Sequence, residues 1–263
     1  MSSEYKVDYH IHSYYSDGTM SPVELVRKYH DDKYDIISIT DHDGIDGVKE
    51  ALTAGEALRM QVLPGVEFST QYAGYEIHIL GYKFDPDNEE LKEKLAELKK
   101  ERRDRNQRLV NKLCEMGYEL SMEELEKRAP KGYVGKPVIA RLMVEKGYIG
   151  SVSEAFESKK IFESDEVKAI KRKKMNTIEA IELINGAGGI AVLAHPGKIK
   201  SLGDKGTAEY RKNLDELIRE LKKGGLKGME CIHPSHSEEE VMDFVTLAGK
   251  YHLHITEGSD YHG

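Results

Sequence analysis

Seven short apolar runs, each bounded by turn residues, recur along the chain. They are rich in valine and isoleucine, and their lengths suit single buried strands. The runs cover residues 6–12, 35–42, 62–69, 75–82, 188–196, 227–234 and 253–262. Helical patterns separate most of them, and this alternation predicts an α/β fold with a mainly parallel sheet or barrel.

Two helix starts among these strands carry capping signals. Ser21 is followed by a proline and then by Glu24, which together form a capping box with proline in the first turn. Asn176 with Glu179 predicts a second start, and the glycines within 186–189 predict the end of that helix.

The middle of the chain breaks this rhythm. Residues 88–175 are highly charged, with leucines at helical spacing and capping boxes that begin at Ser121 and Ser151. We therefore expect a helical insertion over 88–175 that covers the active site of a body formed by 1–87 and 176–263. The basic run KAIKRKKM within it, at 168–175, is typical of a solvated surface, with RNA contact as the alternative.

Composition narrows the class of protein. The 263 residues are 39% hydrophobic and 33% charged, which is typical of an ordinary soluble protein, and the net charge of −8 argues against a stable DNA-binding surface. No apolar run approaches a membrane span and no leader precedes the first strand, so we expect a cytoplasmic protein. Cys114 and Cys231 are too few and too far apart for a disulfide framework or a thiolate zinc site.

Histidines and carboxylates follow the ends of the predicted strands. In an α/β barrel these ends converge on one face, where active sites lie. Strand alternation also places His10 and His12 on the same side of the first strand. The candidate ligands are His10, His12, Asp17, His42, Glu67, His78, His195, Asp260 and His262. Such nitrogen and oxygen donors suit Zn, Mn or Fe, and nine exceed the needs of one ion.

One histidine at a strand end is more often a structural residue, but nine ligand-type residues in this arrangement favour a metal cluster. His30, inside the first helix, and His252 and His254, beside the last strand, lack this placement. We interpret these three as structural.

The segments that carry the nine residues read DYHIHSYYSDGTMSP, ISITDHDGIDG, PGVEFS, EIHILGY, AHPG and GSDYHG. Their ordered set resembles the PHP (polymerase and histidinol phosphatase) phosphoesterases, in particular the bacterial 3′,5′-nucleoside bisphosphate phosphatases and 5′-3′ exoribonucleases. The resemblance spans the chain, including the insertion. It implies a distorted (β/α)7 TIM-like barrel with three divalent metal ions, of which Mn²⁺ is expected and Zn²⁺ or Fe²⁺ are alternatives.

The same resemblance implies how the ligands are shared among the ions. One ion would be held by His10, His12, Glu67 and Asp260, a second by Glu67, His78 and His195, and a third by Asp17, His42 and His262. A metal-bridged hydroxide would attack the phosphate ester, and Asp17 or His262 would protonate the leaving alkoxide.

Substrate contacts in the family come from an arginine-rich helix and a Gly-Arg-Pro-His segment. Here the helix reads KKERRDRNQRLV, in which Arg102 and Arg105 match, with an exposed charged face as the alternative. The second segment reads VGKPVIARLM, in which Lys136 keeps the charge and Val138 replaces the histidine.

A third segment, CIHPSHS, resembles one whose histidines line the pocket, so His233 and His236 are also candidates. Relatives continue past the position of Gly263, so we expect that fraying there weakens metal binding by Asp260 and His262.

These resemblances imply a metal-dependent phosphoesterase that removes the 3′-phosphate of 3′,5′-bisphosphonucleotides, with 5′-3′ trimming of short RNA as a further activity. The expected partner is a small phosphorylated substrate, either a nucleotide or a short RNA 5′ end. A phosphatase for another phosphomonoester, such as histidinol phosphate, is the alternative within enzymes. A non-catalytic metal- or RNA-binding module is the alternative outside them.

Overall fold

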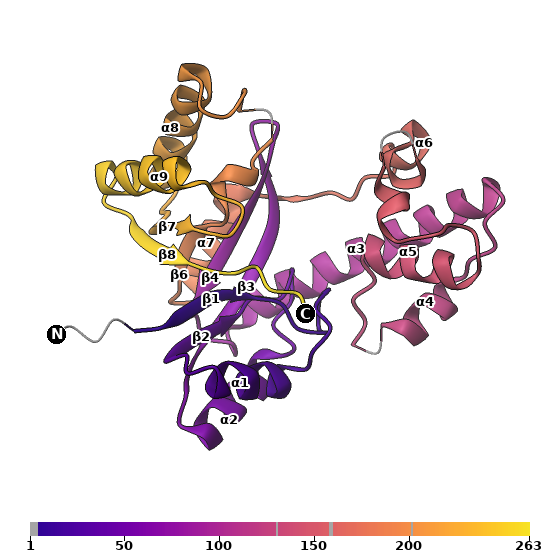
Figure 1. Cartoon of the computed structure of the whole chain (residues 1–263), viewed down its shortest axis with the longest axis horizontal. Helices are drawn as coiled ribbons and strands as arrows, with labels where there is room; N and C mark the ends of the chain where they lie inside the picture. The colour runs from indigo at the N-terminus through magenta and orange to yellow at the C-terminus, as the bar shows by residue number, and fades with distance from the viewer. Residues whose placement is uncertain (1–4, 130, 158–159, 201) are drawn as a thin grey trace.

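Among the described residues, seven strands form a curved, barrel-shaped sheet that is the body of the protein, and helices lie beside it (Figure 1). The computed structural model describes residues 5–129, 131–157, 160–200 and 202–263. In ring order the strands are β1 (Val7–Ile11), β2 (Ile36–Ile39), β3 (Gln61–Tyr72), β4 (Tyr75–Tyr82), β6 (Ile190–Leu193), β7 (Gly228–Ile232) and β8 (His254–Glu257). A short strand, β5 (Met175–Asn176), pairs with β3 outside this order.

The ring nearly closes where the end of the chain returns to the first strand. A bridge joins Ile11 to Tyr261, and the amide of His12 donates to the carbonyl of Tyr261 over 2.8 Å. The amide of Thr19 donates to the carbonyl of His262 over 2.9 Å. The predicted distorted barrel is thereby confirmed, and these bonds hold Tyr261 and His262 beside β1.

Strand β4 runs against its neighbours. It is antiparallel to β3 and β6, whereas the other neighbouring pairs in the ring are parallel. A two-residue turn at Ala73 and Gly74, with φ of 48° and 88°, joins β3 to β4 in a tight hairpin. His78 therefore lies in the first half of its strand, opposite Ser69, and reaches the ligand face because the strand is reversed.

Five helices pack around the barrel. They are α1 (Pro22–Asp31), α2 (Val48–Leu58), α7 (Thr177–Gly186), α8 (Ala208–Lys223) and α9 (Glu238–Lys250). Both predicted caps form: Ser21 and Glu24 make a capping box, and Asn176 accepts from the amide of Ile178. Fully buried side chains such as Phe68 fill the space between strands and helices.

The segment between β4 and β5 is helical and extends to one side of the barrel (Figure 1). It contains α3 (Glu89–Glu115), α4 (Met122–Arg128), α5 (Lys136–Glu145), α6 (Asp165–Lys168) and the 3₁₀ turns η1 (Ser153–Phe156) and η2 (Ile161–Glu163). Its own buried cluster includes Leu113, Leu125 and Phe162. The cap predicted at Ser151 begins only the single turn η1, in which Glu154 donates its amide to Ser151 Oγ over 3.3 Å.

Within the described residues, no helix combines the length and apolar character that a membrane span requires.

One buried carboxylate ties this helical segment to the barrel. Asp43, in the loop after β2, forms ion pairs with Arg102 of α3 and with Arg172, whose Nη2 lies 2.7 Å from Asp43 Oδ2. Its other oxygen accepts the amide of Ser69 over 2.9 Å. The alternative of an exposed helix face is therefore wrong for Arg102, which is 7% exposed.

The interpretation of 168–175 as a solvated surface is wrong for Arg172, whose side chain is only 10% exposed because Asp43 draws it inward. Lys171 and Lys173 on either side are exposed, as expected. Successive side chains of an extended backbone point in opposite directions, so Arg172 points inward while its two neighbours point outward.

We predict that Asp43→Asn destabilises the protein by about 3–5 kcal/mol, because two arginines lose the charge that offsets their burial. Urea unfolding at pH 7 measures this change. As the matched control, Asp32→Asn removes an aspartate that is exposed and pairs with Lys28 on the surface, so its effect should be much smaller. Equal effects of the two substitutions would contradict a buried tie at Asp43.

Candidate metal centre

Glu67 lies at the centre of a histidine cluster. It is fully buried in β3, and its Oε2 lies 2.9 Å from His42 Nδ1 and 3.4 Å from Nε2 of both His10 and His12. These four atoms have no hydrogen-bond partner within the described part of the chain. Buried polar atoms that face one another without hydrogen bonds are strongly unfavourable. A shared cation would satisfy all four.

The other oxygen of Glu67 serves a second group of histidines. Oε1 lies 2.8 Å from His78 Nδ1 and 3.0 Å from His195 Nε2. Burial acts to raise the pKa of Glu67, but the charges of His42, His78 and His10 outweigh burial and hold this pKa well below its usual value. The carboxylate is therefore ionised and can bridge two cations.

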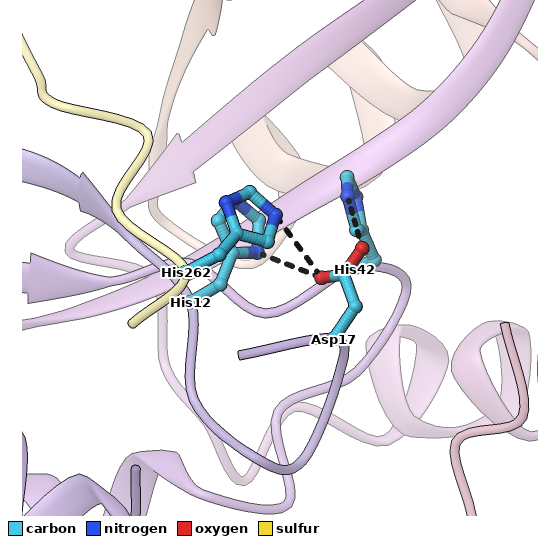
Figure 2. Close-up of side chains that lie close together, drawn as sticks. All are labelled: His12, Asp17, His42 and His262. Atoms are coloured by element: carbon cyan, nitrogen blue, oxygen red, sulfur yellow. Dashed lines mark ion pairs between the residues drawn. The ribbon is translucent and has the colours of Figure 1, made fainter. Parts of the chain in front are cut away.

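Asp17 faces three imidazoles at the open side of the cluster (Figure 2). Its Oδ1 lies 3.3 Å from His262 Nε2 and 3.8 Å from His12 Nδ1, and its Oδ2 lies 3.8 Å from His42 Nε2. The rings of His12 and His262 stack with centroids 4.3 Å apart. The figure shows the carboxylate between this stack and His42. These four residues offer ligand atoms that all lie within 4.8 Å of one another.

Asp260 approaches the cluster from the segment after β8. Its Oδ1 lies 3.4 Å from His10 Nε2 and 3.2 Å from His12 Nε2, and its Oδ2 pairs with Lys198 Nζ over 2.6 Å. Asp260 has a φ of 54°, a conformation that non-glycine residues rarely adopt. Such positions concentrate at functional sites, where surrounding contacts enforce them.

All nine predicted ligands lie in this one cluster. The close sets of three or more ligand atoms are His12, Asp17, His42 and His262; His10, His12 and Glu67; and His42, Glu67 and His78. His195 and Asp260 contact these sets through Glu67 and His12 without belonging to them. His12, His42 and Glu67 each join two sets, so these sets differ from the division among ions that the family resemblance implies. The donors fit divalent cations in number and type.

Three residues outside the predicted ligand set orient the imidazoles. Glu230 Oε1 accepts from His10 Nδ1 over 3.0 Å, and its Oε2 accepts the amide of His195 over 2.8 Å. Ser16 Oγ lies 3.3 Å from His12 Nδ1 and donates to Asp41 Oδ1 over 2.6 Å.

Because Glu230 and the Ser16–Asp41 pair occupy the Nδ1 atoms, Nε2 of His10 and of His12 is free to bind a cation. Burial, and then the charge of His42, lower the pKa of His12 to about 4, which keeps its ring neutral. The sequence analysis did not predict a role for Glu230. The feature that could have indicated one is the position of this carboxylate within the apolar run 227–234.

The two remaining histidine candidates lie beside the cluster. His233 Nε2 is 3.5 Å from Asp260 Oδ2, and the ring centroids of His233 and His236 are 5.1 Å apart. The amide of Gly197 donates to His236 Nε2 over 3.3 Å, and His236 Nδ1 lies 3.0 Å from the carbonyl of Cys231. His236 is thus held on both sides, whereas His233 Nε2 has no hydrogen-bond partner in the described residues.

The predicted phosphate-binding side chains divide between two environments. Arg102 is engaged by Asp43, whereas Arg105 and Lys136 are partly buried and make no ion pair within the described residues. Val138, which replaces the family histidine, is 5% exposed and packs in the core of the helical segment. Its side chain therefore supports packing rather than lining the cluster.

A cavity of about 480 Å³ lies over the cluster. Its lining includes Glu67, His78, His195, Lys198 and Lys200. This volume is within the range of small-molecule sites, and several of the predicted ligands, among them Glu67, His78, His195 and Asp260, line it.

Comparison with known proteins places the chain in a family. The sequence profile of the PHP domain matches residues 8–231, and the chain belongs to this family. It is 30% identical over 257 residues to a 5′-3′ exoribonuclease of Haemophilus influenzae, covering 98% of this chain and 90% of that one. It is 27% identical to a 3′,5′-nucleoside bisphosphate phosphatase of Chromobacterium violaceum, covering 97% and 87%.

A solved structure from Bifidobacterium adolescentis, described as a candidate metal-dependent phosphoesterase, superimposes with a TM-score of 0.83. The two chains are 28% identical, and the match covers 98% of this chain and 88% of the other. Barrel, cluster and family together define the class: the protein is a metal-dependent phosphoesterase of the PHP family.

We predict that Glu230→Gln lowers the affinity for Mn²⁺ by about 10- to 100-fold, because the substitution removes the charge that orients and strengthens His10 as a ligand. Calorimetric titration of the metal-free protein with Mn²⁺ measures this loss. Glu182→Gln, on the exposed side of α7, is the control and should bind as the unaltered protein does. Unchanged affinity in Glu230→Gln would show that the hydrogen bond to His10 has no part in metal binding.

Proposed function

We propose that the protein hydrolyses the 3′-phosphate of 3′,5′-bisphosphonucleotides and trims short 5′-phosphorylated RNA from its 5′ end, with three divalent ions at the histidine–carboxylate cluster. Mn²⁺ is the proposed metal. The names of the two curated relatives support both activities.

The observation that supports this proposal is that two arginines, Arg102 and Arg172, share the single carboxylate of Asp43, the residue after His42, so positive charge exceeds negative charge there. Arg172 pairs with Asp43 through Nη2, while its Nη1 is buried and has no hydrogen-bond partner in the described residues. Burial, and then the charges of Arg172 and Arg102, lower the pKa of Arg105 to about 10. Burial and the charge of Arg105 also lower the pKa of Lys136.

The charge of Arg172 acts on Arg105 and the charge of Arg105 acts on Lys136, so an anion bound beside Arg105 would relieve this repulsion. Arginine is well suited to phosphate, which accepts its parallel N–H groups. A substrate with a second phosphate, in addition to the one hydrolysed, fits this arrangement. A simple phosphomonoester such as histidinol phosphate leaves the cationic group unused.

Divalent ions in the cluster would supply positive charge to the phosphoryl oxygens and acidity to a water nucleophile. The protein itself positions the ions and the substrate and supplies the proton for the leaving group. Glu67 and the histidines around it fix the ligand atoms, and Arg105, Arg172 and Lys136 bind the distal phosphate. Asp17 and His262 lie at the solvent edge, with side chains 18% and 38% exposed. Burial lowers the pKa of His262, but the hydrogen bond to Asp17 outweighs burial and raises it. From the solvent edge His262 can pass a proton to the leaving O3′, and Asp17 holds that proton in place.

The experiment that tests the function measures inorganic phosphate released from adenosine 3′,5′-bisphosphate by the protein reconstituted with Mn²⁺. We expect turnover, and we expect that Arg105→Ala raises KM for the bisphosphate by about tenfold, while p-nitrophenyl phosphate, which has no second phosphate, is affected little. Turnover of histidinol phosphate in preference to the bisphosphate would favour the alternative phosphatase. Absence of any turnover by the metal-loaded protein would instead favour a binding module.

For the proton donor, we predict that Asp17→Ala or His262→Ala lowers kcat by about 10²- to 10⁴-fold, the usual contribution of general acid catalysis. Metal content, measured by elemental analysis after dialysis, should fall much less than kcat. His30→Ala, on the surface of α1, is the control. If kcat and metal content fall in proportion, the residue is a ligand and not an acid.

A further inference from the structure

A second cavity adjoins the metal-cluster cavity. It has a volume of about 600 Å³ and lies between the loop after β2, helices α3 and α4, and residues 131–134. His42 lines both cavities. The two cavities therefore share the side chain of His42 as part of their walls.

Aromatic rings and an arginine form the boundary near His42. The ring of Tyr133 stacks on His42 with centroids 6.3 Å apart and an interplanar angle of 20°. Arg102 Cζ lies 4.1 Å from the Tyr133 ring centroid, so Arg102 lies over this ring while Asp43 holds its charge. Tyr15 also lines the cavity. Flat rings at the edge of a cationic cavity can stack with nucleobases, whatever their sequence.

The side chains that line the cavity carry more positive than negative charges. Each acidic side chain of the lining has a cationic partner: Asp43 with Arg102, Asp46 with Lys99, and Glu126 with Arg103. Lys100 and Lys131 have no acidic partner within the described residues, and Lys131 Nζ lies 4.9 Å from the ring centroid of Tyr15. Two ammonium groups are thus available to phosphates.

One buried acceptor in the lining also has no partner. Asn106 is 2% exposed, and its Nδ2 donates to the carbonyl of Val134 over 2.7 Å. Its Oδ1 is buried without a hydrogen-bond partner among the described residues. A ligand that brings an N–H or O–H group, such as a ribose 2′-hydroxyl or a base amine, would satisfy this oxygen.

We propose that this cavity binds the nucleotide that follows the scissile phosphate in an RNA chain. The inference rests on the proposed function, because it assigns the RNA-trimming activity to a site that a mononucleotide does not use. The first nucleotide lies on the side of Arg105 and Lys136, the scissile phosphate lies at the metal cluster, and the downstream chain passes His42 into the second cavity.

The reaction balances in this arrangement. Water adds its oxygen to phosphorus, the bond from phosphorus to O3′ of the first nucleotide breaks, and O3′ takes a proton. The first nucleotide leaves with a 3′-hydroxyl, and the shortened RNA keeps the phosphate on its new 5′ end. With adenosine 3′,5′-bisphosphate the same bond breaks, but inorganic phosphate leaves and the second cavity has no role.

The test compares two substrates with one double variant, Lys100→Ala with Lys131→Ala, in the Mn²⁺-loaded protein. The substrates are adenosine 3′,5′-bisphosphate and a 5′-phosphorylated adenosine pentamer. We expect kcat/KM for the pentamer to fall by about tenfold or more while that for the bisphosphate is unchanged. The salt dependence of pentamer hydrolysis should also weaken, with a log–log slope smaller by about 0.7 for each phosphate that a lysine no longer neutralises.

A second double variant serves as control: Lys112→Ala with Lys127→Ala removes two lysines that pair with Glu115 and Glu123 away from the cavity lining. It should leave kcat/KM for both substrates unchanged.

Pentamer hydrolysis that is unchanged in the first variant, or that falls together with bisphosphate hydrolysis, would overturn the cavity assignment. So would a wild-type protein that hydrolyses the bisphosphate and not the pentamer, although the proposed phosphatase function would then stand. Failure to hydrolyse the bisphosphate would instead overturn the phosphatase function itself.

Discussion

The buried carboxylate of Glu67 is the constraint on which the rest of the site depends. Five histidines from four parts of the barrel direct ring nitrogens to within 3.4 Å of its two oxygens. A buried anion requires compensating charge or hydrogen bonds, and here Oε2 and the three ring nitrogens that face it have no hydrogen-bond partner among the described residues. The cluster is therefore arranged for cations, and the surrounding β strands are held in the positions that bring its ligands together.

A buried carboxylate also holds together the region between the barrel and the helical segment. Asp43 compensates Arg102 and Arg172, so two segments separated by 70 residues of sequence meet at one carboxylate of the barrel. Arg105 and Lys136 form no ion pair within the described part of the chain, and the charge of Arg172 acts on Arg105. The wall formed by Arg102, Tyr133 and His42 separates this region from the second cavity. One contact thus positions Arg102 at the edge of the second cavity and Arg172 at the junction with the helical segment.

Much of the barrel could be predicted because its strands are apolar runs of the right length with helix caps between them. The expected strands over 6–12, 62–69 and 227–234 correspond to β1, β3 and β7. The reversal of β4 was not anticipated, since a turn at Ala73 and Gly74 leaves no distinct pattern in an apolar stretch. The inward direction of Arg172 was also missed, because its partner Asp43 is 129 residues away in sequence.

Sequence by itself determined which residue types stand at the strand ends, because ligand chemistry requires histidine and carboxylate and strand alternation fixes their side. The sequence also contains the family motifs, and these motifs indicate phosphoesterase chemistry. Only the tertiary structure decided which atoms face one another: that Glu230 and the Ser16–Asp41 pair fix the rings of His10 and His12, that Val138 packs in a core, and that His42 joins two cavities. Most of these contacts join residues far apart in the chain, so no local pattern predicts them.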